Sequence, residues 1–277
     1  MTPLEIALAL LVTLAMLAQG LDLELSKLSE TLRAPRVLLW GLGLNIVLLP
    51  LAVLLTIRVA GLSAALAAAL LLCAAAPGGG TGGLLAASVK GDMALATALQ
   101  VLLAGSLVLT PFWLAFGLPQ RGDTHAVITA ALKSVVLFQW LPLIAGLWLR
   151  RQHAPLAARL HPWAKQAANL ILLALIIVLF WRDGARMLDQ DGRSLLAIGL
   201  LVVVGFGVAG VLPGTRAERA TLRMITVNRN LSLALLLAAS FFQDPAVLML
   251  ILIYALIMYL GCAAYIAVIR LTKPVIR

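Results

Sequence analysis

Long stretches without a charged residue constrain this chain more than any other feature. No charge occurs between Arg58 and Lys90, and similar apolar runs follow one another along the sequence. Hydrophobic residues make up 63% of the 277 residues and charged residues 12%, whereas about a quarter of a soluble domain is charged. One membrane crossing needs about 20 apolar residues. The sequence therefore predicts an all-α, polytopic membrane protein with one transmembrane domain over 1–277, and it excludes a soluble globular fold.

Glycine, proline and charged residues divide the apolar runs into nine predicted transmembrane helices. The first run is not preceded by a positive segment and has no cleavage-type site, so we expect a retained helix and not a signal peptide. The helices are predicted near 3–20, 37–59, 62–89, 93–118, 126–149, 166–182, 194–213, 217–243 and 246–270.

Lysine and arginine are distributed unequally between the two sides that these helices define. Fourteen lie on the side of the carboxyl terminus: Lys27, Arg33, Arg36, Lys90, Arg150, Arg151, Arg159, Lys165, Arg216, Arg219, Arg223, Arg270, Lys273 and Arg277. Five lie on the other side: Arg58, Arg121, Arg182, Arg186 and Arg193. The excess predicts a multi-pass protein of the cell (inner) membrane with its amino terminus outside and its carboxyl terminus in the cytoplasm. The net charge of +10 belongs to this pattern, so we expect a lipid bilayer, and not nucleic acid, as its surroundings.

Two short segments on the predicted inner side have helical amphipathic spacing. One carries leucines 21, 25, 28 and 32, and the other carries Leu156, Leu160 and Trp163. Both are interpreted as surface collars. Cys73 and Cys262 lie inside apolar runs, which favours packed thiols over a disulfide or a metal cluster.

The third predicted helix is interrupted at its centre by Pro77 to Gly83, where five of seven residues are glycine. The segment 62–76 would reach about 22 Å as a helix, which is short of the ~30 Å hydrocarbon core. Unpaired backbone at membrane depth is tolerated where it lines a cavity. We therefore expect a half-helix that borders a cavity, and the alternative is an ordinary loop between two short helices.

The eighth predicted helix is also interrupted, by Thr226 to Asn230, where four of five side chains are polar. The third helix runs inward and the eighth outward. This arrangement is the inverted repeat with discontinuous helices that is typical of secondary transporters, in which half-helix amino termini face a substrate near the midplane. It predicts a substrate site where the two broken helices cross.

Three segments carry a resemblance to the bile acid:sodium symporter family. They are 76–79, read Ala-Pro-Gly-Gly, 90–95, read Lys-Gly-Asp-Met-Ala-Leu, and 230–234 in the eighth helix. The resemblance implies six core helices, including the two crossed ones, packed against a flatter panel. We assign the core to about 62–118 and 194–270, and the panel to about 3–59 and 126–182. The chain resembles a nine-helix version of this fold.

The sodium ligands that the resemblance implies are nearly all replaced. Their positions hold Gly82, Gly83, Ala96, Gln100, Ile225 and Arg229, and the second-helix glutamine becomes Asn45. All acidic residues lie at helix ends or in connections, whereas sodium prefers oxygen ligands that include a carboxylate. We expect no bound metal, no cofactor and no requirement for sodium. The alternative is sodium coupling through rearranged ligands at Thr81, Thr97, Asn45 and Asn228.

Arg229 and Lys133 are basic residues that belong to neither side of the membrane. An arginine at membrane depth is costly and needs partners. We interpret Arg229 as a tethered cation that replaces sodium and is bound by Asn45, Asn228 or Gln100; the alternative is a snorkelling helix-end residue. Lys133 would meet a substrate carboxylate if it faces the cavity. The complete predicted substrate-binding set is Arg229, Asn228, Asn230, Asn45, Thr81, Gly80, Gly82, Gly83, Gln100 and Lys133, although each amide could equally be interhelical glue.

These expectations combine into one functional prediction. We expect a secondary transporter of small organic anions, bile-acid-like or other amphipathic carboxylates, which works by alternating access without sodium. The alternatives are a sodium-coupled symporter with rearranged ligands, an anion channel, and a non-transporting sensor. No nucleophile–base pair, metal-ligand spacing or phosphate loop indicates an enzyme, so no catalytic residue is predicted.

Overall fold

The computed structural model describes residues 2–24, 35–117, 124–188, 192–242 and 244–271. In these ranges every regular element is helical. Eight helices are long and apolar enough to cross a membrane, and a further apolar helix, Ala64–Ala75, is shorter. This confirms the predicted all-α, polytopic membrane fold. The first predicted amphipathic segment, around residues 25–32, lies outside the described residues.

The chain contains the following elements, in order: α1 (Pro3–Asp22), α3 (Pro35–Gly43), η1 (Leu44–Leu48), α4 (Leu49–Ala60), α5 (Ala64–Ala75), α6 (Gly82–Ser88), α7 (Met93–Ser106), η2 (Leu107–Leu109), α8 (Thr110–Gly117), α9 (Thr124–Ser134), η3 (Val135–Trp140), α10 (Leu141–Gln152), α11 (Ala154–Leu188), α12 (Gly192–Val211), α13 (Arg216–Val227), α14 (Leu231–Phe241) and α15 (Pro245–Leu271).

Local capping explains where several helices begin. Thr2 and Glu5 form a capping box at α1, and Thr215 and Glu218 form the same device at α13. The side chain of Asp92 accepts a hydrogen bond from the amide of Leu95 at the start of α7. Each cap satisfies amide groups that a helix start leaves without an intrahelical partner.

Two spans contain a wide helical turn just before a proline. The π-helical segment η1 precedes Pro50, and η3 precedes Pro142. Proline supplies no amide hydrogen and disturbs the preceding turn, which favours such a bulge. Each bulge carries one fully buried amide side chain, Asn45 in η1 and Gln139 in η3. The two bulges therefore place polar groups inside otherwise apolar helices.

The long helix α11 corrects the predicted start at residue 166, because it begins at Ala154. The second predicted amphipathic segment, with Leu156, Leu160 and Trp163, is part of this helix and not a separate collar. Pro155 lies in the first helical turn, where a missing amide costs little, and Pro162 is accommodated inside the helix. The polar and apolar spacing was recognised correctly, but the position of the break was wrong.

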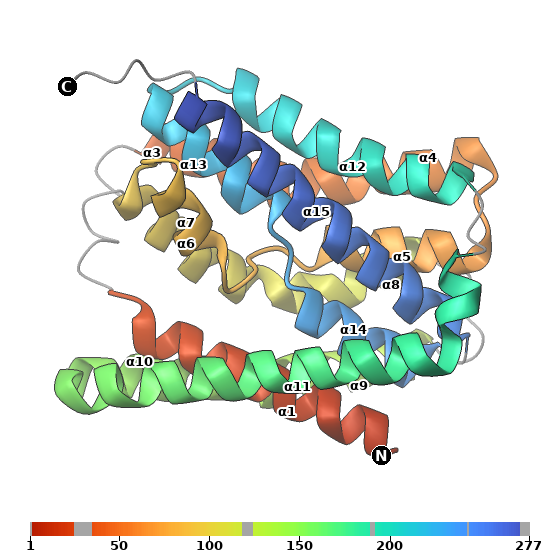
Figure 1. Cartoon of the computed structure of the whole chain (residues 1–277), viewed down its shortest axis with the longest axis horizontal. Helices are drawn as coiled ribbons and strands as arrows, with labels where there is room; N and C mark the ends of the chain where they lie inside the picture. Colours follow the sequence, from red (N-terminus) through yellow and green to blue (C-terminus); the bar gives the residue numbers. More distant parts are fainter. Residues whose placement is uncertain (1, 25–34, 118–123, 189–191, 243, 272–277) are drawn as a thin grey trace.

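The helices lie side by side along the long axis of the molecule (Figure 1). Helix α1 packs most extensively against α10 and α11, and these three form one layer. The span from Pro35 to Ala60 packs against α5 and α7, which belong to the predicted core, and not against that layer. The division into core and panel stays a prediction. The broken pairs α5/α6 and α13/α14 run in opposite directions between α11 and α12 (Figure 1).

The ends of the helices alternate between the two ends of the molecule. The end of α1, the junction of α10 and α11, the start of α13 and the end of α15 share one end (Figure 1). This alternation is the one used to count the basic residues on each side. Which end faces the cytoplasm stays a prediction from charge.

Candidate functional site

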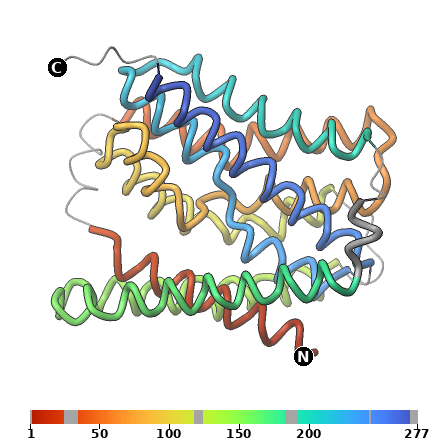
Figure 2. Tube along the Cα trace, viewed as in Figure 1, coloured from red at the N-terminus to blue at the C-terminus, as the bar shows by residue number. Residues whose placement is uncertain are grey.

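The two broken helices meet through their extended segments, 76–81 and 228–230, near the middle of the molecule (Figure 2). The amide of Gly79 donates to the carbonyl of Asn228 at 3.2 Å, and the amide of Asn230 donates to the carbonyl of Ala76 at 2.9 Å. Each interruption therefore satisfies backbone groups of the other. This pairing explains how non-helical backbone is accommodated at that depth.

The side chain of Asn228 ties the two segments together. Its Nδ2 donates to the carbonyl of Gly79 at 2.8 Å, and its Oδ1 accepts from the hydroxyl of Thr81 at 3.0 Å. A Cβ at Gly79 would lie 2.5 Å from the carbonyl oxygen of Arg229 and 2.6 Å from Asn228 Nδ2. Only glycine allows this approach.

The two π-helical segments each contribute an amide to the crossing. Asn45 Nδ2 donates to the Thr226 hydroxyl at 3.0 Å and to the Gly41 carbonyl at 2.8 Å. On the other side, Asn230 Nδ2 donates to Gln139 Oε1 at 3.0 Å, while Asn230 Oδ1 caps α14 at 3.1 Å. The bulges therefore position both halves of the second broken helix.

Arg229 is 3% exposed and lies inside the helix bundle at the crossing. Its guanidinium interacts with the hydroxyl of Tyr254 and lies near Cys73, and that hydroxyl donates to the Val227 carbonyl at 3.1 Å. Its Nη1 has no hydrogen-bond partner. Within the described ranges no carboxylate pairs with it. Asn45 and Asn228, two of its expected partners, bond other groups instead.

The positions that the resemblance assigns to sodium ligands are filled by other atoms. A Cβ at Gly82 would lie 2.7 Å from Ile225 Cδ1, and a Cβ at Gly83 would lie 2.8 Å from Gln100 Oε1. Ile225 is 1% exposed and packs in an apolar cluster that includes Ala96. The searched residues hold no group of three or more histidine, cysteine or acidic side chains that would bind a metal ion.

A cavity of about 170 Å³ lies between the crossing and the helices α1 and α11. Seven of the predicted site residues line it: Gly80, Thr81, Gly83, Gln100, Asn228, Arg229 and Asn230. Gly82, Asn45 and Lys133 do not line it, and Lys133 is exposed on α9. The structure therefore brings together the residues of both interruptions but not the lysine that was expected to face them.

Other polar residues complete the lining and were missed from the sequence. They are Gln19 and Asp22 of α1, His161, Lys165 and Asn169 of α11, Ser232 of α14, and Tyr259 of α15. His161, Lys165 and Asn169 are spaced four residues apart, which places them on one face of α11. This polar stripe was a readable signal, but Lys165 had been assigned to a connection because α11 was predicted to start at residue 166.

Gln19 is the least satisfied of these side chains. It is 5% exposed, and neither atom of its amide has a hydrogen-bond partner. Its Oε1 lies 3.7 Å from the position that a Cβ would take at Gly80. A buried, unpaired amide is costly, and a ligand in the cavity would supply the missing contacts.

Two discontinuous helices that meet at mid-depth beside a polar cavity place this protein in the class of membrane transporters. The chain belongs to the sodium bile acid symporter family, whose model matches residues 9–190. The match includes the first broken helix and ends before the second. No curated relative matches the chain. Members of this family are transporters and not enzymes, which confirms the prediction that the protein is a transporter and not an enzyme.

Proposed function

We propose that this protein transports amphipathic organic anions by alternating access and that it does so without sodium. The observation that carries the proposal is the burial of Arg229, a permanent cation, to which the described residues offer no carboxylate. Guanidinium remains protonated at any physiological pH. Its charge therefore stands permanently at the crossing, in a surrounding of low dielectric where electrostatic interactions extend further than in water.

Steric filling supports independence from sodium. The Ile225 side chain occupies the space beside Gly82, and Gln100 occupies the space beside Gly83. The resemblance assigns sodium ligands to these positions, but their present side chains offer one amide oxygen and no carboxylate. A fixed cation at 229 would supply the positive charge that bound sodium would supply at the sites implied by the resemblance.

The cavity lining supports an anion with an apolar body. Arg229 and Lys165 supply two positive charges to the lining against the single negative charge of Asp22. Gln19 offers an unpaired amide. Leu11, Met16 and Leu172 provide apolar wall. Because 170 Å³ is smaller than the roughly 300 Å³ of a typical ligand site, the cavity fits the carboxylate end of such a substrate, and the apolar part would extend beyond it.

Uptake into proteoliposomes, measured in sodium and in choline at equal ionic strength, tests the proposal. A panel of amphipathic carboxylates should be screened first by thermal stabilisation of the purified protein. We expect equal uptake in both cations. A saturable sodium dependence of about tenfold, equivalent to roughly 1.4 kcal/mol of coupling, would overturn the sodium-independent mechanism.

A sodium-coupled mechanism is the second candidate, and one observation favours it. Asn45 Oδ1 is buried and has no hydrogen-bond partner. It lies beside Thr226, whose hydroxyl is bound by the other amide atom of Asn45. If these oxygens bind sodium, the same uptake experiment shows the dependence, and Asn45→Ala removes it.

A further inference from the structure

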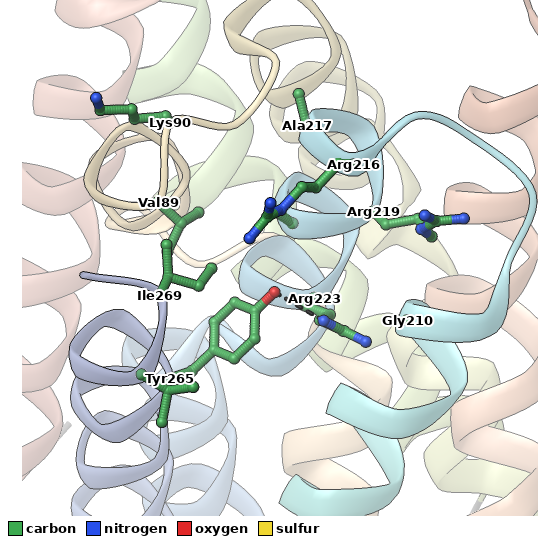
Figure 3. Close-up of a pocket in the computed structure, with 11 residues that line it drawn as sticks. Val89, Lys90, Gly210, Arg216, Ala217, Arg219, Arg223, Tyr265 and Ile269 are labelled. Carbon is green, nitrogen blue, oxygen red and sulfur yellow. Dashed lines mark hydrogen bonds between the residues drawn. The ribbon is translucent and has the colours of Figure 1, made fainter. Parts of the chain in front are cut away.

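A larger cavity, of about 680 Å³, lies where α13 begins and α15 ends, away from the crossing (Figure 3). It is lined by Val89, Lys90, Gly210, Arg216, Ala217, Arg219, Ala220, Arg223, Tyr265, Val268 and Ile269. Four of these residues are basic and none is acidic. This pocket plays no part in the proposed transport site.

Three arginines lie on one face of α13, at spacings of three and four residues. Such neighbours repel one another on a helix. Arg216 and Arg219 also lie in the first turns, where the helix dipole disfavours positive charge. The acidic neighbour Glu218 binds the amide of Thr215 in the capping box and does not line the pocket. The cluster is therefore unfavourable unless an anion occupies it.

One cation and one hydroxyl in the pocket are already positioned. Arg223 Nη1 donates to the Tyr265 hydroxyl at 2.8 Å, and the guanidinium lies 5.2 Å from the centre of the same ring. Gly210 makes room for this group, since a Cβ there would overlap the guanidinium. The Arg216 guanidinium and the Tyr265 hydroxyl point into the pocket, whereas Lys90 and Arg219 extend outward on opposite sides of it (Figure 3).

No salt bridge joins any of the four basic side chains within the described part of the chain. Lys90 and Arg216 are exposed, so their long stems are free to turn toward a bound anion. The cluster therefore combines one guanidinium held by Tyr265 with three cations that have no such partner in the described part of the chain.

The other part of the lining is apolar. Val89, Val268 and Ile269 border the pocket, and the nearby helix ends carry Val211 at 83% and Leu271 at 84% exposure. Transfer of such apolar surface from water to a lipid chain is favourable. An anionic group attached to an apolar chain would match both parts of the lining.

We propose that this pocket binds a phosphate group, either of an anionic phospholipid or of a soluble phosphate compound. Arginine side chains bind phosphate oxygens with paired, charge-assisted hydrogen bonds, and Lys90 would contribute a further charge. The apolar rim favours the lipid as the source. Binding would hold the start of α13, whose other end reaches the crossing at Asn228, and would thereby stabilise one half of the second broken helix.

Thermal unfolding of the full-length protein in a neutral detergent tests this inference. The arms contain added phosphatidylglycerol, added phosphatidylcholine, or inorganic phosphate. The test variant is R216Q/R219Q, and the matched control is R151Q/R159Q, which removes two exposed cations at the same end of the molecule, near the junction of α10 and α11. Both variants lose the same charge, so nonspecific electrostatic effects are equal.

We expect phosphatidylglycerol to raise the Tm of the wild type and of the control by about 2 °C or more, and that of R216Q/R219Q by much less. Without lipid the test variant should be at least as stable as the wild type, because it relieves repulsion in α13. A selective response to inorganic phosphate without one to phosphatidylglycerol would identify a soluble source. No response in the wild type, or equal responses in both variants, would overturn the proposal. The readout is binding, so it stands apart from the transport test.

Discussion

The two broken helices both satisfy the backbone groups of their interruptions, but the residues at the two interruptions are of different kinds. Between α5 and α6 three of the six residues are glycine, and between α13 and α14 the chain is asparagine and arginine. The first interruption contributes mainly backbone, since Gly79 offers its amide and its carbonyl to Asn228. The second contributes the side chains that bind, cap and carry charge.

The difference shows that the two interruptions depend on each other. Asn228 and Arg229 can approach the first segment only because Gly79 has no side chain. Conversely, the glycine segment has few side-chain groups of its own to satisfy its backbone, so it relies on Asn228. The first broken helix provides the space for a close approach, and the second provides the polar and charged side chains. Each of the following predictions tests one part of this division.

The largest effect is expected from filling the space. Gly79→Val places a branched side chain where a single Cβ would already lie 2.5 Å from the Arg229 carbonyl. The nearest neighbour is a backbone atom, so the surrounding structure can relax only a little. We expect a loss of stability of roughly 3 kcal/mol or more together with loss of transport. Thermal unfolding and uptake measure both effects.

The matched control is Gly105→Ala in α7, where nothing lies within 4 Å of the added Cβ. That change should leave stability unchanged or raise it by about 0.5–1 kcal/mol, because alanine favours a helix. Equal behaviour of the two variants would contradict the steric half of the comparison.

The second prediction removes the charge from the second interruption. Arg229→Gln should reduce uptake of the anionic substrate about tenfold or more, because it deletes a buried cation that no carboxylate neutralises in the part of the chain that the structure describes. Ile225→Glu with Arg229 kept should have a similar effect, since a carboxylate beside the crossing would offset the charge. Arg229→Lys retains the charge and should retain part of the activity. Uptake of Arg229→Gln at the wild-type rate would make Arg229 a structural residue.

Sequence patterns predicted the elements that local chemistry determines. Glycine and proline at 77–83 and the polar run at 226–230 identified both interruptions, and apolar length identified the spans. The partners of Arg229 were not predictable, because Tyr254 lies in a different helix and nothing in its spacing marks it. The contribution of α11 was missed for a different reason: the start of this helix was predicted near residue 166 and 156–163 was interpreted as a separate surface segment, whereas the helix begins at Ala154.

The third prediction concerns a variant designed to convert the crossing into a sodium-binding site. The variant Gly82→Ser, Gly83→Asn, Ile225→Glu and Arg229→Gln restores the implied ligands at four positions, and only the full set should create sodium dependence, of about tenfold. Gly82→Ser alone meets Ile225 Cδ1 and should be tolerated better once Ile225 is replaced. Sodium titration of uptake in the quadruple variant measures the result. Sodium dependence in the parent would remove the reason for the conversion.

The smallest effect is expected from two lysines outside the crossing. Comparing them tests whether the surrounding helices also contribute charge to substrate binding. Lys165 lines the cavity from α11, whereas Lys133 is exposed on α9 and does not line it. Both side chains are exposed and not buried, so a charge contact through either is modest, and we expect Lys165→Gln to lower the apparent affinity for an organic anion roughly two- to fivefold. Lys133→Gln removes the same charge and should change the affinity by less than this, which makes it the matched control. Concentration dependence of uptake, measured for both variants at low and at moderate salt, separates the two positions, because screening weakens an exposed contact. The opposite order, with Lys133 the more sensitive residue, would restore the expectation drawn from the sequence and would move the substrate away from α11.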